Sequence, residues 1–335
     1  MGGDFMERNN WRGTVRLLRY WLGPLLLAGC GGGSGSGTGD NGTAVVPGAP
    51  SSPLPTPTPS PTQSPALTYA NAFDFSRDRS FQALGASLRV IRPFNTNASE
   101  IESVLQPNDS TISASYTAGT GSILVRYEGV QSTVSGAPAT RSDSEIAWTQ
   151  GPTATSRSEV VAFVPPLPRY QSIIWGRFAT QTTLPMAAGV EDVNRLLLAG
   201  SSTVPADIPT IGGAGFAPIL RATAQTTNGP RLFSETGNVT MRVEYATRIF
   251  TASIPYLETG SDPSRAPETG GLTFSGTLNP ITNEVSGSVY SYDTSWSGAF
   301  TGRLYGPGGD ELGVIFAMRR AGDGARAVGE LAGKR

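Results

Sequence analysis

Short stretches in which apolar and polar residues alternate recur along most of the chain. Residues 112–116 and 123–127 both alternate in this way, and a Gly-Thr-Gly turn at 119–121 joins them. A period of two indicates β-strands, and two such runs around a short glycine link predict a hairpin. The same reasoning predicts strands at 159–164 and 170–178.

The C-terminal part of the chain repeats this pattern with a regular rhythm. Residues 190–198 could form a helix, but Gly189 and Gly200 bracket them, which favours a strand. After them come short segments separated by links rich in Asn, Gly, Asp and Pro. Eight strands are predicted there, at 215–224, 237–245, 248–254, 271–278, 284–290, 298–305, 311–318 and 327–331. An even number of short antiparallel strands with glycines inside them favours closure into a barrel, which removes free sheet edges.

The N-terminus has a different pattern. Four arginines precede the apolar run 20–27, which is too short to span a bilayer because a helix needs about 20 apolar residues. A basic segment before a short apolar run is typical of a secretory signal peptide. We therefore expect a signal peptide over residues 1–29.

Leu27, Ala28, Gly29 and Cys30 follow the apolar run and resemble the bacterial lipobox, in which the cysteine is acylated and becomes the mature N-terminus. The alternative is a buried or incidental cysteine. It is the weaker one, because Cys30 is the chain's one cysteine and stands where cleavage is expected. Several acyl chains, palmitate among them, would hold the protein on a membrane, since each buried CH2 contributes about 0.8 kcal/mol. Gly31 follows the cysteine where an aspartate would favour the inner membrane, so we expect the outer membrane. This residue leaves the face of that membrane open; the cell surface is the expected face, with the periplasmic face as the alternative.

Residues 31–66 contain few apolar side chains. Their first part is rich in Gly, Ser and Thr, and their second part carries repeated Pro-Thr and Pro-Ser. The first composition is typical of a flexible coil and the second of extended polyproline II. Together with Cys30 they predict a disordered tether over 30–66 that projects a folded body from the membrane.

Composition narrows the possible chemistry. The 335 residues include no His and one Cys, and the formal net charge is −1. This excludes Ser-His-Asp and Cys-His arrangements, imidazole ligation of haem, internal disulfides and Cys-cluster metal sites. A charge near zero gives no reason to expect nucleic acid as a partner. We therefore expect neither a cofactor nor a metal, and no enzymatic activity.

The remaining polar and aromatic clusters favour structural roles. Asp310 and Glu311 are adjacent, so in a strand they point to opposite faces and cannot act as a carboxylate pair. The charged residues at 74–79 are expected to form a solvated segment. Core and girdle positions are expected for six aromatic residues: Trp148, Trp175, Tyr245, Tyr290, Tyr292 and Trp296.

The segment Phe300-Thr-Gly-Arg-Leu-Tyr-Gly-Pro-Gly-Gly-Asp-Glu-Leu-Gly-Val-Ile-Phe316 resembles the closing signature of the transferrin-binding-protein-B-like β-barrel lipoproteins. Residues 271–276 and 285–289 fit the hairpin that precedes this signature, and 204–210 fit the family's approach to the barrel. The resemblance covers roughly 170–335. It identifies seven structural signature residues: Gly302, Tyr305, Gly306, Pro307, Glu311, Gly313 and Phe316.

Two of these signature elements have a simple physical function. Tyr305-Gly306-Pro307 is expected to form a turn, because Gly tolerates positive φ and Pro fixes φ near −65°. Glu311 is expected to accept hydrogen bonds from backbone donors at the loop.

The resulting prediction is an all-β protein with a handle-like β-rich domain at 67–205 and an eight-stranded antiparallel β-barrel at 206–335. The resemblance implies a monomeric, non-enzymatic lipoprotein that binds a macromolecular partner, expected to be a protein partner, in iron or haem acquisition. The alternatives are a lipocalin-like carrier with a small apolar ligand in the barrel, and a structural or assembly protein of the envelope. The barrel interior decides between the first two, because a carrier needs a cavity there. If the barrel-facing positions are filled by Phe274, Tyr290, Phe300 and Phe316 with no void, the carrier hypothesis fails. A cavity of several hundred Å3 inside the barrel would instead count against partner binding.

Overall fold

The fold was analysed in a computed structural model of the whole chain. It describes residues 69, 72, 74, 76–95, 99–106, 111–134, 140–141, 146–150, 156–163, 172–185, 188–260 and 266–335. The predicted signal peptide, Cys30 and the predicted tether lie outside these residues.

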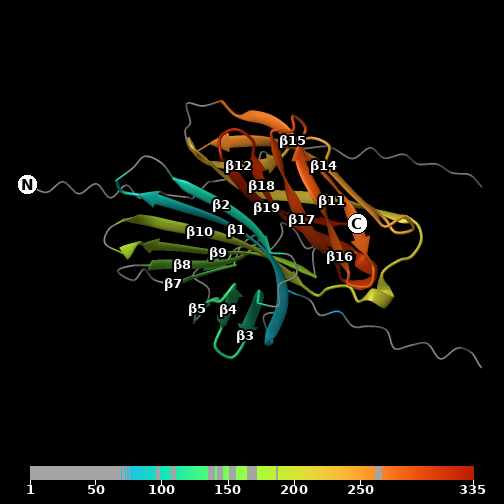
Figure 1. Cartoon of the computed structure of the whole chain (residues 1–335). Helices are drawn as coiled ribbons and strands as arrows, with labels where there is room; N and C mark the ends of the chain where they lie inside the picture. The colour runs from blue at the N-terminus through green and yellow to red at the C-terminus, as the bar shows by residue number, and fades with distance from the viewer. Residues whose placement is uncertain are drawn as a thin grey trace, which may run out of the picture. The chain divides into compact units, whose positions relative to one another are not determined.

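The first half of the described chain forms one antiparallel sheet of ten strands, which we call the handle sheet (Figure 1). Its order is β5-β4-β3-β1-β10-β9-β8-β7-β6, and β2 also pairs with β1. The strands are β1 (Arg79–Pro93), β2 (Glu100–Gln106), β3 (Ser113–Thr117), β4 (Ser122–Tyr127), β5 (Val130–Val134), β6 (Thr140–Arg141), β7 (Ile146–Gln150), β8 (Ser156–Phe163), β9 (Ile173–Thr183) and β10 (Gly189–Gly200).

The second half forms a closed antiparallel barrel, because its last strand pairs with its first. The strands are β11 (Gly213–Thr226), β12 (Gly229–Glu235), β13 (Thr240–Glu244), β14 (Ile249–Gly260), β15 (Glu268–Asn279), β16 (Glu284–Ser291), β17 (Trp296–Tyr305), β18 (Glu311–Arg320) and β19 (Arg326–Lys334). The short strands β12 and β13 both lie between β11 and β14, one after the other. They share one position in the barrel, so the predicted eight-stranded architecture is confirmed.

Several strand predictions are confirmed and several strands were missed. The hairpin of β3 and β4 and the strand β10 are present as predicted. β9 begins at Ile173 and extends to Thr183, later than expected. β1, β2, β5, β6, β7 and β12 were not predicted. Arg79, placed by the sequence in a solvated segment, begins β1 and pairs with Asp74 at 2.7 Å.

Alternation along the barrel strands fills the interior with apolar side chains. Phe274 lies against Phe300 and Phe316, with ring centroids 5.5 and 5.3 Å apart. Phe300 also contacts Phe250 at 5.2 Å, and all four rings are buried. Tyr290, considered with them as barrel-facing, is 40% exposed, because it lies on the outward side of β16 between inward-facing Val289 and Ser291. That part of the prediction is wrong.

The outer wall of the barrel packs against one face of the handle sheet. A shared cluster joins Leu84, Ala86 and Leu198 of the handle sheet to Ile315 and Val328 of the barrel. Figure 1 shows β1, β2 and β10 next to the barrel strands. The other face of the handle sheet has a separate core beneath β3, β4 and β5. β1 is therefore buried on both faces.

Candidate binding site at the barrel mouth

Four strand connections meet at one end of the barrel, which we call the mouth. They join β11 to β12, β14 to β15, β16 to β17, and β18 to β19. The opposite end, which we call the base, carries the turns that join β13 to β14, β15 to β16, and β17 to β18. The short helices η2 (Pro205–Asp207) and η3 (Pro307–Gly309) lie at the base, where Asp207 bonds to η3.

The mouth contains a pocket of about 410 Å3. Aromatic and charged side chains from four of the barrel strands (β14, β15, β17 and β18) and from the β16–β17 turn surround it. The lining residues are Tyr256, Glu258, Glu268, Thr269, Gly270, Gly271, Tyr292, Asp293, Ser295, Trp296 and Arg320. Such a mixture of aromatic surface with a few converging polar groups is typical of ligand sites.

Aromatic rings close the pocket toward the barrel core. Tyr256 meets Phe233 edge to face at 4.8 Å, and Phe233 meets Trp296 at 6.0 Å. Tyr256 can lie flat against β15 because the neighbouring residue is Gly270. A Cβ at that position would lie 2.6 Å from Cζ of Tyr256. The floor of the pocket is therefore rigid and apolar.

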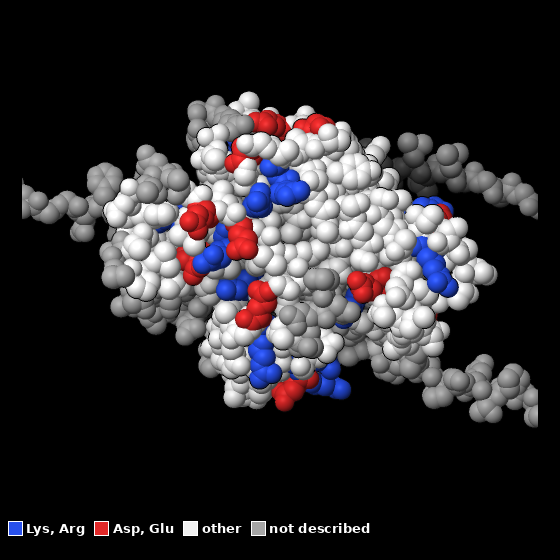
Figure 2. Space-filling model, in the orientation of Figure 1, with Lys and Arg blue, Asp and Glu red and all other residues white. Residues whose placement is uncertain are grey.

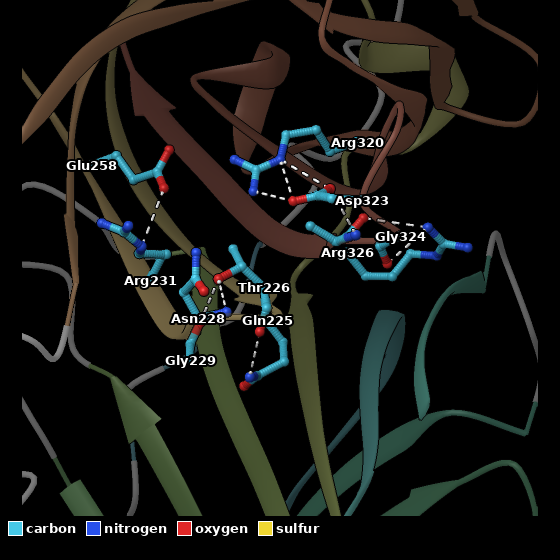
Figure 3. Close-up of polar contacts among 11 residues, drawn as sticks. Gln225, Thr226, Asn228, Gly229, Arg231, Glu258, Arg320, Asp323, Gly324 and Arg326 are labelled. Atoms are coloured by element: carbon cyan, nitrogen blue, oxygen red, sulfur yellow. Dashed lines mark hydrogen bonds and ion pairs between the residues drawn. The ribbon is translucent and has the colours of Figure 1, made fainter. Parts of the chain in front are cut away.

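A buried ion pair lies beside this floor (Figure 3). Arg231 is 2% exposed and Glu258 is 3% exposed, and Nε of Arg231 lies 3.6 Å from Oε1 of Glu258. Both face inward, and Gly260 leaves room for the guanidinium, since a Cβ there would lie 2.9 Å from Nη1. Charges removed from water carry a desolvation cost that their mutual attraction often offsets only in part. The mouth therefore contains polar groups that structural stability alone does not favour.

A second arginine is held over the indole at the mouth. The guanidinium of Arg320 lies 5.0 Å from the ring centroid of Trp296, and its Nε donates to both carboxylate oxygens of Asp323 at 3.1 Å (Figure 3). The hydrogen bond raises the pKa of Arg320 and lowers that of Asp323. The cation–π contact and the carboxylate fix the orientation of the arginine.

The turn from β16 to β17 is held by one carboxylate. Oδ1 of Asp293 accepts from the backbone N–H and the hydroxyl of Ser295 at 3.1 and 2.9 Å, and also from the hydroxyl of Ser291. The Ser291 hydrogen bond lowers the pKa of Asp293. Burial raises the pKa of Tyr256 to about 12, and the charges of Glu258 and Asp293 add to the rise. The electrostatic potential at the phenol of Tyr256 is therefore made more negative by these two carboxylates.

Tyr292 forms the lip of the pocket. Its ring crosses β15 at Gly271, where a Cβ would lie 2.1 Å from Cε2 of the tyrosine. Its hydroxyl lies 2.7 Å from the hydroxyl of Ser253. The side chain nevertheless remains 53% exposed. It offers an aromatic surface that is held in place and open to a partner.

The signature residues predicted from the sequence lie away from the mouth. Tyr305, Gly306 and Pro307 lie at the base, and Gly306 has φ of 72° as the turn requires. Oε2 of Glu311 accepts from the backbone N–H groups of Ser172 and Ile173 at 3.0 and 2.9 Å. These donors belong to the beginning of β9 and not to the β17–β18 loop itself. Glu311 therefore links the two sheets.

Three further signature residues lie within the walls. Gly313 faces the handle sheet, where a Cβ would lie 2.7 Å from Cδ2 of Leu198. Gly302 lies against the neighbouring strand, and Phe316 is buried in the barrel interior. The predicted lipidation residues Leu27, Ala28, Gly29 and Cys30 lie outside the described residues.

The structure separates the aromatic residues that the sequence grouped together. Tyr245 and Trp296 are buried, whereas Tyr290 and Tyr292 are exposed, so these last two do not belong to the core among the predicted core and girdle positions. The side chains of Trp148 and Trp175 lie outside the description. The charged residues of the mouth were missed. One signal could have found them, because Arg231 and Glu258 continue the inward positions of Phe233 and Tyr256 along their strands.

Within the described part of the chain, no group of three or more Asp, Glu, His or Cys side chains is placed to hold a metal ion. No helix among the same residues is long and apolar enough to cross a membrane. Figure 2 shows one face of the molecule, where basic and acidic side chains form small mixed groups separated by uncharged surface. Any recognition on this face therefore depends on local groups rather than on a broad field of one sign.

No protein-family model and no curated protein sequence matches the chain. Among solved structures, the chain is similar to transferrin-binding protein B from Haemophilus parasuis, with a TM-score of 0.45 and 14% identity over 75% of this chain and 45% of that protein. Similarity to the protein of the same name from Neisseria meningitidis has a TM-score of 0.38 and 12% identity, over 75% and 43%.

HpuA from Kingella denitrificans, solved in complex with human haemoglobin, has a TM-score of 0.34 and 12% identity over 80% of this chain and 90% of that one. The chain thus spans less than half the length of the transferrin-binding proteins. Similarity at such identities concerns the fold alone.

Proposed function

We propose that this protein is a non-enzymatic lipoprotein of the outer-membrane surface, acylated at Cys30, that binds a macromolecular partner at the barrel mouth. The observation that carries the proposal is the combination of a filled barrel with a concave, aromatic and charged mouth. Phe250, Phe274, Phe300 and Phe316 occupy the interior, so a ligand meets the barrel at its end. This disfavours the carrier alternative, which needs an apolar cavity between the walls.

The mouth has the features of an energetic centre of an interface. Such centres are enriched in Tyr, Trp and Arg and lie in well-packed pockets. Tyr292 is exposed at the lip, Trp296 forms part of the floor, and Arg320 is already oriented by Asp323. Little side-chain freedom would be lost on binding, which favours affinity.

A photo-crosslinking experiment on the lipidated protein in cells tests this proposal. A benzophenone amino acid replaces Tyr292 at the mouth or, as a matched control, Phe94 at the end of β1, an aromatic residue that is 59% exposed. We expect a discrete cross-linked protein from position 292 and not from position 94. Crosslinks from 94 alone would move the interface to the handle sheet. No crosslink from either position would contradict a macromolecular partner.

Alanine variants then measure the contribution of the mouth. Arg320→Ala is expected to weaken capture of the cross-linked partner about thirtyfold or more, since hot-spot residues contribute roughly 2 kcal/mol or more. Leu232→Ala, on the outer wall and 44% exposed, serves as the control and should leave affinity unchanged. Equal affinity of the two variants would contradict binding at the mouth.

The finer proposal is that the partner is an iron- or haem-carrying protein. The resemblance of residues 300–316 to the closing signature of transferrin-binding-protein-B-like lipoproteins supports it. The crosslinking is therefore repeated in iron-replete and iron-limited cells with serum proteins added. A partner that carries neither iron nor haem would overturn this finer proposal and leave the first intact.

Protease treatment of intact cells tests the proposed location. A surface protein should be released or cleaved without lysis, at the predicted tether of residues 31–66. Protection until the cells are lysed would place the protein on the periplasmic face.

A further inference from the structure

The described chain begins at the base of the barrel. The hydroxyl of Tyr69 donates to Oδ2 of Asp207 at 2.8 Å, and the same oxygen accepts from the backbone N–H of Gly308 at 3.1 Å. The backbone N–H of Val204 in turn donates to the hydroxyl of Tyr69 at 3.2 Å. The tether predicted over 31–66 therefore joins the body at the base and not at the mouth.

The base also presents apolar side chains to solvent. Ile211 is 82% exposed and Ile281 is 79% exposed, the highest values among the large hydrophobic residues of the described chain. Ile249, also at the base, is 46% exposed. Ile208, by contrast, is 5% exposed and belongs to the barrel core. The chain therefore passes from the core to the surface between Ile208 and Ile211.

Ile211 lies in a first connection at the base, Ile249 is the first residue after a second, and Ile281 lies in a third, and these three connections are neighbours along the rim. The backbone N–H of Tyr245 donates to the carbonyl of Gly212 at 2.9 Å, which joins the first connection to the second. The backbone N–H of Leu278 donates to the carbonyl of Arg248 at 2.8 Å, which joins the second to the third. The exposed side chains thus belong to one rim.

The turn that carries Ile281 is held in place. Asn283 donates through Nδ2 to the carbonyls of Thr203 and Leu304, both at 2.8 Å, and accepts from the backbone N–H of Leu304 at 3.1 Å. Ile281 is 79% exposed in this fixed turn, so its side chain contributes no burial of apolar surface to the stability of the isolated protein.

We propose that the base of the barrel docks on a lipid surface, with Ile211, Ile249 and Ile281 entering the headgroup region and the mouth pointing away from the membrane. The inference rests on the proposed lipid anchor at Cys30, because thirty-six residues separate that anchor from the folded body and end at the base. An anchored body samples the membrane surface at high local concentration, so modest apolar contacts are sufficient. Exposed Arg248 lies next to Ile249, where a cation would meet lipid phosphates.

Single-cysteine labelling of the lipidated protein in phospholipid vesicles tests the proposal. Acylation occupies the thiol of Cys30, the chain's one cysteine, so an introduced cysteine is labelled alone. An environment-sensitive fluorophore is placed at Ile211→Cys or Ile281→Cys at the base, and at Thr227→Cys at the mouth as a control. We expect the base labels to shift to shorter wavelength and to be quenched by lipid-borne quenchers, and the mouth label to do neither.

Two comparisons separate docking from anchoring and from self-association. Vesicle flotation of the wild-type and Cys30→Ser proteins measures the anchor itself, so failure of the anchor is distinguished from failure of docking. Flotation with base labels that remain in water would overturn the docking proposal while the anchor stands. A shift that appears without vesicles as the concentration of the Cys30→Ser protein rises would assign the isoleucines to contacts between copies of this chain and also overturn it.

Discussion

Among the described residues, Glu330 is a buried carboxyl whose surroundings disfavour ionisation. It lies on β19 between Val328 and Ala332, which pack against the handle sheet, so its side chain faces the same contact. It is 1% exposed, and its Oε2 has no hydrogen-bond partner among the described residues. Burial raises its pKa to about 8, although Arg221 on the paired strand opposes the rise.

Replacement of Glu330 by Gln is expected to change how stability depends on pH. An unfolded glutamic acid ionises near pH 4.5, whereas Glu330 in the folded protein ionises near 8. Between these values the folded state holds the extra proton, so the free energy of unfolding falls as pH rises, by up to about 1.4 kcal/mol per pH unit. Urea unfolding of Glu330→Gln at pH 5, 6.5 and 8 should show a flatter profile and a more stable protein at pH 8.

Glu102→Gln on exposed β2 is the control for a surface carboxylate, with its side chain 60% accessible. If Glu330→Gln follows the wild-type pH profile as closely as this control does, the buried carboxyl does not govern the pH dependence.

At the scale of the strands, glycines allow aromatic rings to lie across the barrel wall. Gly276 on β15 is opposite Gly287 on β16, and the ring of Phe300 covers them from inside. In the same way, Gly270 leaves space for the ring of Tyr256 on the inner side of the wall, and Gly271 leaves space for the ring of Tyr292 on the outer side. The strands approach closely where these rings cross, which keeps the interior filled up to the mouth.

Whether a strand could be predicted depended mainly on whether its residues alternate between buried and exposed positions. The hairpin of β3 and β4 was predictable because Ile123, Val125 and Tyr127 are buried on one face while their neighbours are not. β1 was missed because residues 83–88 are buried on both faces, which removes the alternation. β12 was missed because Gly229-Pro230 indicates a turn. Pro230 is tolerated there because it lies at the first positions of a strand.

The inward positions of Arg231 and Glu258 could be found from alternation along their strands, but their pairing at the mouth could not be predicted because it depends on barrel register. Arg231 is opposite Gly260 and Phe233 is opposite Glu258, so the ion pair is diagonal across two strands that are separated in sequence by β13. Residue type and spacing along the chain contain no sign of that proximity. The signature residues at the base were predictable because each shapes its own turn or lies next to it. Glu311 is the exception, since its hydrogen-bond partners lie in the handle sheet.

Two glycines of the barrel should respond oppositely to alanine. A Cβ at Gly276 would lie 2.2 Å from the carbonyl oxygen of Ser286 and 2.7 Å from Cζ of Phe300. Gly276→Ala should therefore lower the free energy of unfolding by about 1–3 kcal/mol. A Cβ at Gly215 on β11 would meet nothing within 4 Å. Gly215→Ala should be neutral or stabilising by up to about 1 kcal/mol, through reduced freedom of the unfolded chain.

Chemical denaturation of both variants measures the difference. Equal stability of Gly276→Ala and Gly215→Ala would contradict the close packing of β15, β16 and Phe300.

At the scale of the whole body, the two sheets are joined by apolar packing along the barrel wall and by polar contacts at the base. Glu311 is the first residue of β18, and its side chain points away from the barrel interior toward the handle sheet. It accepts hydrogen bonds from the backbone N–H groups of Ser172, just before β9, and of Ile173, the first residue of β9. Lys334 of the last barrel strand lies 3.6 Å from its other oxygen. A carboxylate that is 2% exposed thus contributes a polar link between the handle sheet and the barrel, beside their apolar contact. That geometry also fixes where the handle surface lies relative to a partner at the mouth.

Removal of Glu311 should therefore loosen the handle sheet before it affects the barrel. Glu311→Ala leaves two buried backbone N–H groups without their charged acceptor, and each such hydrogen bond contributes about 1.5–3 kcal/mol. We expect faster hydrogen exchange at the amides of Ser172 and Ile173 and through β9, with unchanged protection in β14, β15 and β16. Glu311→Gln keeps an acceptor oxygen and should recover part of the protection.

Asp310→Asn is the control, because its carboxylate is half exposed and lies 3.8 Å from Arg335, where exposed pairs contribute at most about 1 kcal/mol. Exchange that accelerates equally in both sheets would mean that Glu311 supports global stability alone, and unchanged exchange at Ser172 and Ile173 would mean that the two sheets are held by their apolar contact without it.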